Sequence, residues 1–204
     1  MIKLIIFDYD GVIVDSFVNV YEVYKIICTK LGKIFPRNIE EFRKEYLKGY
    51  KQFEKNLCFS DEDQDKAEVL YKELIMKKSP EMFVGIDSVI KELSKKYIIT
   101  LVSASYQEEV VNKLNAFKLD KYFKEIIGKV ILDKEPLHKD VKFLEIMKNF
   151  NVKGDEVLVI GDRQGDYENA VKVGIKKVIL VEYGWGFDKE SCAENSCRQA
   201  RRYF

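Results

Sequence analysis

The sequence predicts an α/β protein with a doubly wound parallel sheet and an all-helical segment inserted after the first strand. Four short runs rich in apolar and β-branched residues predict buried strands, at residues 4–7, 97–105, 156–162 and 176–184. Amphipathic patterns with a helical period lie between the later runs, as at residues 107–117. This alternation of strands and helices indicates a parallel sheet with right-handed crossovers.

Residues 16–80 interrupt this alternation, because they contain no strand-like run. Their patterns have a helical period and are rich in Lys, Glu, Tyr and Phe, at residues 17–32, 39–49 and 63–78. We therefore expect an inserted helical domain over residues 16–80 and an α/β core domain formed by residues 1–15 and 81–204. The last stretch, residues 188–204, lacks apolar periodicity, and we expect it to be poorly ordered.

Length and composition limit the classes of function. A chain of 204 residues has room for one main domain and a smaller insertion. With 35 basic and 34 acidic residues, the net charge of +1 argues against a nucleic-acid or anionic-membrane partner. The apolar N-terminal run is too short to span a bilayer and has no cleavage pattern, which predicts a cytoplasmic protein. The 4 cysteines match no disulfide or metal spacing, so we expect free thiols.

The first predicted strand runs directly into two acids, Asp8 and Asp10. Two carboxylates held close together repel each other unless a cation or a shared proton offsets their charge. In open α/β sheets, ligands bind at the carboxyl ends of the strands, where these acids lie. The pattern therefore predicts a divalent metal ion at this edge of the sheet.

Two later strands end in residues of related chemistry. The second predicted strand ends near Ser103, and the third ends in the sequence GDRQGD, which contains Asp162 and Asp166. Because parallel strands present their carboxyl ends along one edge, we expect these side chains to converge with the first two acids. Each motif alone is common by chance, but their occurrence together, in this order and each at a strand end, is specific.

These motifs resemble those of the haloacid dehalogenase superfamily. DYDGVIVDS is similar to its first motif, Ser103 to its second and GDRQGD to its fourth, and the text between them resembles the phosphoglycolate-phosphatase-like members. The resemblance extends from residue 1 to about residue 186. It implies a Rossmann-like core with a helical cap at residues 16–80, and a Mg²⁺-dependent phosphatase. Such an enzyme hydrolyses a small soluble phosphomonoester through an aspartyl-phosphate.

The resemblance also assigns roles to the four acids. Asp8 is implied as the nucleophile that attacks phosphorus, and Asp10 as the acid that protonates the leaving oxygen and then deprotonates water. Asp8, Asp162 and the main-chain carbonyl of Asp10 would bind Mg²⁺, an ion that prefers oxygen ligands. Asp166 would orient this shell.

Phosphoryl binding is implied for Ser103 and for backbone N–H groups around Gly11 and Ala104. The third motif of the family is a lysine, often followed by prolines that this chain lacks. Lys134 and Lys139 are both candidates. We favour Lys139, because it opens a predicted helix and because its separation from the fourth motif is like that in relatives without the prolines.

The insertion is expected to select the substrate. Gly49 interrupts a helical pattern and predicts a turn between two helices of the insertion. In related capped enzymes such a turn carries residues that read the substrate, and Lys51 is the candidate we favour for a remote anionic group or the phosphate.

A mutase, a receiver-like module and a non-catalytic phosphate-binding protein are alternatives to a phosphatase. A phosphosugar mutase of the β-phosphoglucomutase type shares the aspartyl-phosphate step, and the sequence separates it poorly from a phosphatase. A receiver-like module and a protein that binds phosphate without catalysis fit the residues less well than a phosphatase does. The sequence predicts a small phosphorylated metabolite as partner and is compatible with a monomer or a homodimer.

Overall fold

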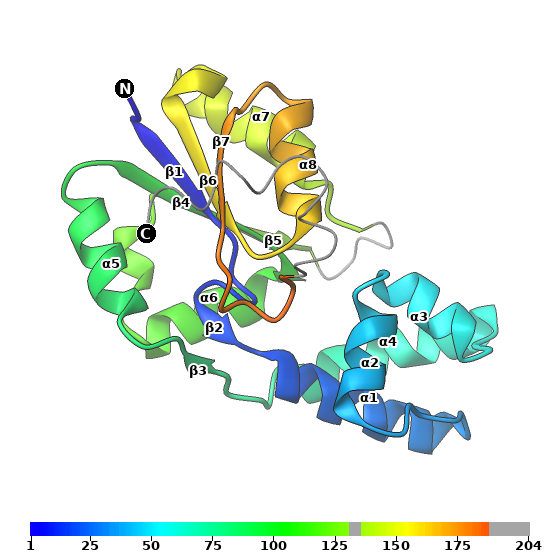
Figure 1. The fold of residues 1–204 in the computed structure, drawn as a ribbon. Coiled ribbons are helices and arrows are strands. Elements are labelled where there is room, and N and C mark those ends of the chain that lie inside the picture. Colours follow the sequence, from blue (N-terminus) through cyan, green and yellow to red (C-terminus); the bar gives the residue numbers. More distant parts are fainter. Residues whose placement is uncertain (131–135, 188–204) are drawn as a thin grey trace. The chain divides into compact units, whose positions relative to one another are not determined.

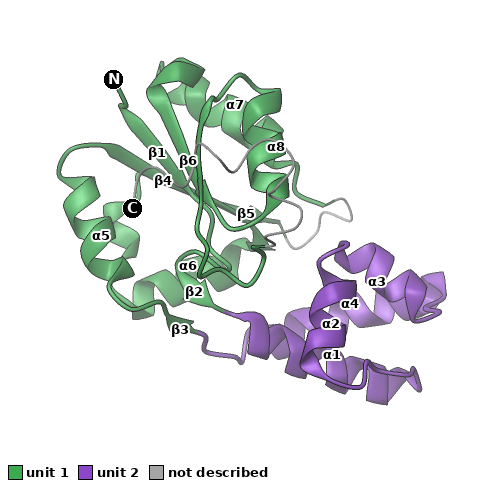
Figure 2. Ribbon diagram, in the orientation of Figure 1, with its two compact units in different colours: residues 1–15, 81–204 green, residues 16–80 purple. Residues whose placement is uncertain are grey.

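The computed structural model describes residues 1–130 and 136–187, and the chain forms two compact units (Figures 1 and 2). The core unit comprises Met1–Asp15 and Glu81–Phe204, and the helical unit comprises Ser16–Pro80. Each unit is described by itself below. Among the described residues, no helix is both long enough and apolar enough to cross a membrane.

The core unit is built on a five-stranded sheet in the order β5-β4-β1-β6-β7, and every neighbouring pair in it is parallel. This arrangement confirms the predicted fold class. The strands are β1 (Leu4–Phe7), β4 (Ile98–Tyr106), β5 (Glu125–Lys129), β6 (Val157–Gly161) and β7 (Lys177–Leu180).

Helices cover both faces of this sheet (Figure 1). Side chains alternate along β1, so that Ile5 and Phe7 pack in one apolar cluster while Leu4 and Ile6 pack in the other. The first cluster includes residues of α5 (Ile86–Ser94) and α6 (Gln107–Ala116), and the second includes residues of α7 (Lys139–Asn149) and α8 (Gln164–Lys172). Because both faces of the sheet are covered, the central strand β1 is apolar throughout, as the sequence indicates.

The helical unit contains four helices: α1 (Phe17–Leu31), α2 (Ile39–Tyr46), α3 (Tyr50–Asn56) and α4 (Asp61–Ile75). Its core is largely aromatic. Phe42 is fully buried, and its ring lies within 6.1 Å, between centroids, of rings from α1 and α3. Gly49 separates α2 from α3 and has a φ of 108°, which confirms the turn predicted at this glycine.

The structure corrects three details of the sequence-based prediction. β5 was not predicted, because its sequence EIIGK is short and includes two charged residues and a glycine. β4 does not end at Ser103 but continues to Tyr106. A small antiparallel pair, β2 (Val14–Asp15) with β3 (Glu81–Met82), was also missed, since two-residue strands carry no periodicity.

Part of the prediction falls outside the described residues. The tail at residues 188–204, with Cys192 and Cys197, and the candidate Lys134 are in this group. Of the two described cysteines, Cys28 is buried and Cys58 is exposed, and both are free thiols.

Candidate active site

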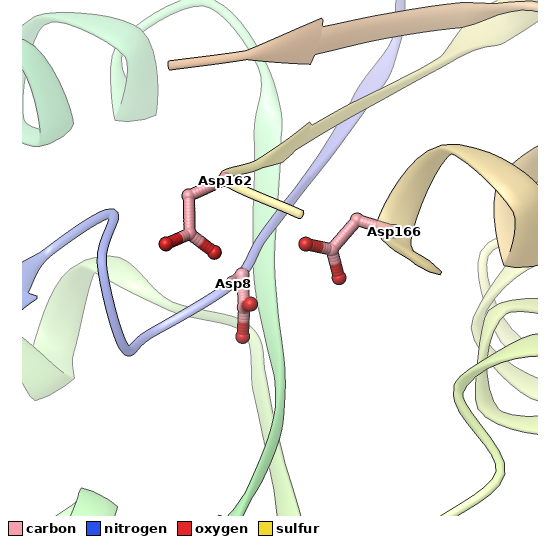
Figure 3. Close-up of side chains that lie close together, drawn as sticks. All are labelled: Asp8, Asp162 and Asp166. Atoms are coloured by element: carbon pink, nitrogen blue, oxygen red, sulfur yellow. The ribbon is translucent and has the colours of Figure 1, made fainter. Parts of the chain in front are cut away.

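Three buried carboxylates meet at the carboxyl edge of the sheet. β1 and β6 are neighbours, with Phe7 beside Ile160, so Asp8 and Asp162 follow the two strand ends. Asp166 lies in the first turn of α8 and completes the group (Figure 3). One carboxylate oxygen from each of the three lies within 4.8 Å of the others. The acids at the ends of β1 and β6 therefore lie close together because the two strands are neighbours in the sheet.

Lys139 lies between two of these acids. As the first residue of α7, it brings its Nζ to 2.8 Å from Asp8 Oδ2 and 2.7 Å from Asp166 Oδ1. The lysine side chain is 13% exposed, so the two ion pairs are well shielded from water. One lysine offsets only part of the charge of three carboxylates.

The pKa values reflect this uncompensated charge. Burial raises the pKa of Asp8 to about 8, although Lys139 acts against the shift. Burial also raises the pKa of Asp162 to about 6, opposed by the nearby charge of Arg163. For Lys139, burial disfavours the charged form, but Asp166 and Asp8 outweigh it and raise the pKa. Burial therefore favours the protonated forms of Asp8 and Asp162, and a bound cation would oppose this effect.

The three acids fit a divalent metal ion. Asp162 is 1% exposed, its Oδ2 accepts a hydrogen bond from the N–H of Gly186 at 2.7 Å, and its Oδ1 has no partner among the described residues. A buried carboxylate oxygen without a partner is costly, and a cation would satisfy it. A group of ligands made only of carboxylate oxygens suits Mg²⁺.

Asp10 stands apart from this cluster. The described carboxylates that group as possible metal ligands are those of Asp8, Asp162 and Asp166, whereas Asp10 Oδ2 accepts a hydrogen bond from Ser105 Oγ at 2.6 Å. Ser103 Oγ also donates to this oxygen, at the longer distance of 3.4 Å. Asp8 thus forms an ion pair with Lys139, whereas Asp10 accepts hydrogen bonds from the hydroxyls of Ser103 and Ser105.

The residues expected to bind phosphoryl oxygens have mixed outcomes. Ser103 is buried on β4 and Ala104 is exposed at the carboxyl edge of the sheet. Gly11 turns the chain with a φ of 77°, and its N–H donates to the carbonyl of Val14 at 2.9 Å. The N–H of Gly11 is therefore used in the turn, and phosphoryl binding by the N–H groups around Gly11 and Ala104 stays a prediction.

Close packing explains the glycine at position 11 more fully. A Cβ atom there would collide with the carboxylate of Asp162. A Cβ atom at Gly184 or Gly186, which follow β7, would also come too close to Asp162. Three glycines thus form a tight cradle around one candidate metal ligand.

This second part of the cradle was missed by the sequence reasoning. No role was predicted for the stretch YGWGF, residues 183–187. The signal was its position, since two glycines directly after a predicted strand lie at the same sheet edge as the acids. In the structure this loop also stacks Trp185 on the guanidinium of Arg163, at 4.2 Å from the ring centroid.

Lys51 belongs to the other unit. It is exposed in the first turn of α3, directly after the Gly49 turn. Lys134, the other candidate for the third motif, lies outside the described residues, so Lys139 is the candidate whose contacts are known.

Comparisons with known proteins agree with this geometry. The sequence model of haloacid dehalogenase-like hydrolases matches residues 5–181. The chain is 26% identical to a phosphoglycolate phosphatase of Pseudomonas fluorescens over 204 residues, covering 95% of this chain and 74% of the relative. It is 23% identical to a phosphorylated carbohydrates phosphatase of Thermotoga maritima, over 88% of this chain and 85% of that one.

Solved structures give the same fold. A haloacid dehalogenase-like hydrolase of Streptococcus pneumoniae superposes with a TM-score of 0.78 at 21% identity, covering 92% of this chain and 88% of the other. At this level of identity the comparison supports the architecture alone.

Proposed function

Because the chain belongs to the haloacid dehalogenase-like hydrolase family, we propose that it is a Mg²⁺-dependent phosphatase acting on a small phosphomonoester through an aspartyl-phosphate. The observation that carries this proposal is the buried group of Asp8, Asp162 and Asp166 with Lys139 between two of its members. Burying three acids together costs stability unless their charge is used.

Asp8 is the nucleophile in this proposal. Both of its oxygens are held, since Oδ1 accepts from the N–H of Tyr9 at 2.8 Å and Oδ2 accepts from Lys139. One of these oxygens attacks phosphorus, the bond from phosphorus to the substrate oxygen breaks, and an aspartyl-phosphate forms. A carboxylate fixed in one orientation loses little freedom when it attacks, which lowers the barrier.

Asp10 moves the proton in both steps. Its carboxylic acid gives a proton to the departing alkoxide, and the resulting carboxylate takes a proton from the water that attacks the aspartyl-phosphate. Inorganic phosphate leaves, and Asp8 and Asp10 return to their starting states. Asp10 suits this role because the hydroxyls of Ser103 and Ser105 donate to its carboxyl group, whereas Asp8 forms an ion pair with Lys139.

A Mg²⁺ ion would be held by Asp8 and Asp162, with the main-chain carbonyl of Asp10, while Asp166 orients the group through Lys139. When bound, such an ion offsets the charge of the carboxylates and of the phosphoryl oxygens. Lys139 supplies a fixed positive charge to the same region, and Ser103 supplies a hydroxyl donor for a phosphoryl oxygen.

The helical unit serves as the cap in this proposal and selects the substrate. Lys51, beside the Gly49 turn, is the residue we assign to a remote anionic group. The phosphatases of known name that the chain resembles act on phosphoglycolate and phosphorylated carbohydrates, which supports a small phosphorylated metabolite.

The deciding experiment compares the purified wild type with Asp8→Asn. We expect Mg²⁺-dependent release of inorganic phosphate from p-nitrophenyl phosphate by the wild type, lost on addition of a chelator. Asp8→Asn is expected to abolish it while retaining the fold, because an amide cannot attack phosphorus. Asp15→Asn is the matched control, since Asp15 is an exposed acid of β2, seven residues further along the chain, and should be dispensable.

Wild-type turnover by Asp8→Asn would overturn the nucleophile assignment. Intact-mass measurement of quenched wild type adds a direct test, because the aspartyl-phosphate increases the mass of the chain by one phosphoryl group. A phosphosugar substrate distinguishes the mutase alternative, which would convert the sugar phosphate into its isomer instead of releasing phosphate.

A further inference from the structure

A local widening of β4 brings Ser105 to the candidate active site. β4 and β5 pair at Val102 with Ile127 and again at Tyr106 with Lys129, so residues 103–105 of β4 face a single residue of β5. Such a bulge redirects side chains at the end of a strand. In this stretch the hydroxyls of Ser103 and Ser105, two residues apart on β4, both donate to Asp10 in the loop that follows β1.

The side chain of Gln107, two residues after Ser105, stabilises the bulge. The side-chain amide of Gln107 donates to the carbonyl of Ile126 at 2.7 Å, and its Oε1 accepts from the N–H of Gly128. One glutamine side chain thus replaces the backbone hydrogen bonds that the bulge removes. The Gln107 side chain therefore ties the end of β4, two residues after Ser105, to β5.

The hydrogen bond from Ser105 Oγ to Asp10 Oδ2 is short, at 2.6 Å. This length is at the short end of the range for hydrogen bonds between two oxygen atoms. Ser103 Oγ donates to the same oxygen at 3.4 Å and accepts from the N–H of Ser105 at 3.0 Å. Of the two serines, Ser105 therefore makes the stronger contact with Asp10.

We propose that Ser105 is a positioning residue that fixes the direction of the Asp10 carboxyl group for proton transfer; this inference rests on the proposed function. Ser103 was expected from the sequence, but no role was assigned to Ser105. A carboxyl group that rotates freely about its side-chain bonds delivers a proton in many directions, and one held by a short hydrogen bond delivers it in one. Ser105 acts through Asp10 and does not contact the substrate.

The test uses two substrates of nearly equal size that differ in how much they need a proton. Phenyl phosphate releases phenol, a poor leaving group that depends on protonation, while p-nitrophenyl phosphate releases a good leaving group that does not. The value of kcat/KM reports the first chemical step, where Asp10 gives its proton. The ratio of kcat/KM for the two substrates therefore measures how well Asp10 is positioned.

Ser105→Ala should lower kcat/KM for phenyl phosphate by roughly 10- to 100-fold and for p-nitrophenyl phosphate by less than about threefold, since general acid catalysis contributes on the order of 10²- to 10⁴-fold. Ser105→Thr keeps the hydroxyl and should restore the ratio. Ser94→Ala is the control, because Ser94 lies on α5 and donates to the carbonyl of Lys91. Equal losses on both substrates, or no rescue by Thr, would overturn the inference.

Asp10→Asn, alone and combined with Ser105→Ala, separates this inference from the proposed function. Asp10→Asn should reduce the same ratio, and Ser105→Ala should then add no further loss. An unchanged ratio in Asp10→Asn would refute the acid role of Asp10 itself. A reduced ratio in Asp10→Asn with an unchanged ratio in Ser105→Ala would refute only the positioning role. Thermal unfolding of each variant checks that all of them are folded.

Discussion

Charged residues are buried in one region of the molecule and exposed in another. At the sheet edge of the core unit, Asp8, Asp162 and Asp166 are at most 8% exposed. Around the Gly49 turn of the helical unit, Lys48 and Lys51 are exposed, and Lys48 forms an ion pair with Glu45, three residues earlier. Buried charge costs stability and so indicates a use, whereas exposed charge costs almost nothing and indicates none.

The helical unit also contains one buried acid, and it is accommodated differently. Glu54 on α3 is 6% exposed, and its Oε1 accepts a hydrogen bond from the hydroxyl of Tyr24 on α1 at 3.0 Å. A single carboxyl paired with a neutral hydroxyl ties two helices together. A cluster of acids around one lysine, as in the core unit, demands a further cation. The difference predicts where substitutions affect turnover most.

The largest effect is expected for Asp162→Asn. This change removes the charge but keeps an oxygen that can accept from the N–H of Gly186. We expect turnover to fall on the order of a thousandfold, because metal binding is lost, while the free energy of unfolding stays equal or rises. Phosphate release measures the first, and urea unfolding without metal measures the second.

Magnesium binding provides a readout that does not depend on activity. Mg²⁺ should raise the melting temperature of the wild type but not of Asp162→Asn, since a ligand stabilises only the state that binds it. Asp155→Asn is the control, an exposed acid just before β6. Normal Mg²⁺ stabilisation of Asp162→Asn would remove this residue from the metal site.

A smaller loss, roughly a hundredfold in turnover, is expected for Lys139→Met, because a fixed charge near the transferring group is removed. The variant should also be less stable by about 3 kcal/mol or more, since two buried carboxylates lose their partner. Lys142→Met is the control on the same helix, because Lys142 pairs with Glu145 at the surface. Lys134→Met should retain activity, and the opposite result would transfer the role of the third-motif lysine to Lys134.

The strands that the sequence predicted are those with an uninterrupted run of apolar residues, including the edge strand β7. Runs such as LIIF in β1 can be read without tertiary information, because burial on both sides demands apolar residues throughout. β5 lies at an edge of the sheet and its sequence is less apolar, so it gave no comparable signal. The order of the strands then brought Asp8 and Asp162 together without any further information.

The parts of the site that the sequence did not predict depend on contacts between distant segments. Ser105 contacts Asp10 from the bulged end of β4, and Gly186 donates to Asp162 from the loop after β7. A bulge and a loop path are determined by packing rather than by periodicity. The proposed role of Lys51 rests instead on the resemblance to the family, and the exposure of its side chain neither supports nor opposes that role.

Lys51→Ala should therefore have a modest effect that depends on the substrate. For the best anionic substrate found in a panel of phosphorylated metabolites, we expect kcat/KM to fall roughly tenfold, about 1.4 kcal/mol. Turnover of p-nitrophenyl phosphate, which lacks a second anionic group, should barely change. Lys55→Ala, an exposed lysine one turn later on α3, is the control. Equal losses on both substrates would assign Lys51 to the phosphate or to cap closure, and no loss would exclude it.

Glu109 is a buried acid for which we expect almost no effect on turnover. It lies in the first turn of α6 and is 4% exposed, and burial, together with the charge of Asp10, raises its pKa to about 8, opposed by Lys113. At pH 7 the folded protein therefore holds Glu109 mostly neutral. Glu109→Gln imitates this form, so turnover at that pH should stay within about twofold of the wild type.

The effect of Glu109 should instead be on stability, and its sign follows from the pKa. Between the ordinary value of 4.5 and the folded value of about 8, the folded state keeps a proton that the unfolded state has lost. The stability of the wild type should therefore fall with rising pH across this window, by about 1.4 kcal/mol per pH unit from this group. Glu109→Gln lacks this dependence, so the variant should match the wild type near pH 4.5 and exceed it increasingly up to pH 8. Urea unfolding at several pH values, with a chelator present, measures the difference between the two proteins. Parallel pH profiles would show that Glu109 is ionised in the folded state. Buried charge at this edge of the sheet would then extend beyond the three clustered acids, Asp8, Asp162 and Asp166.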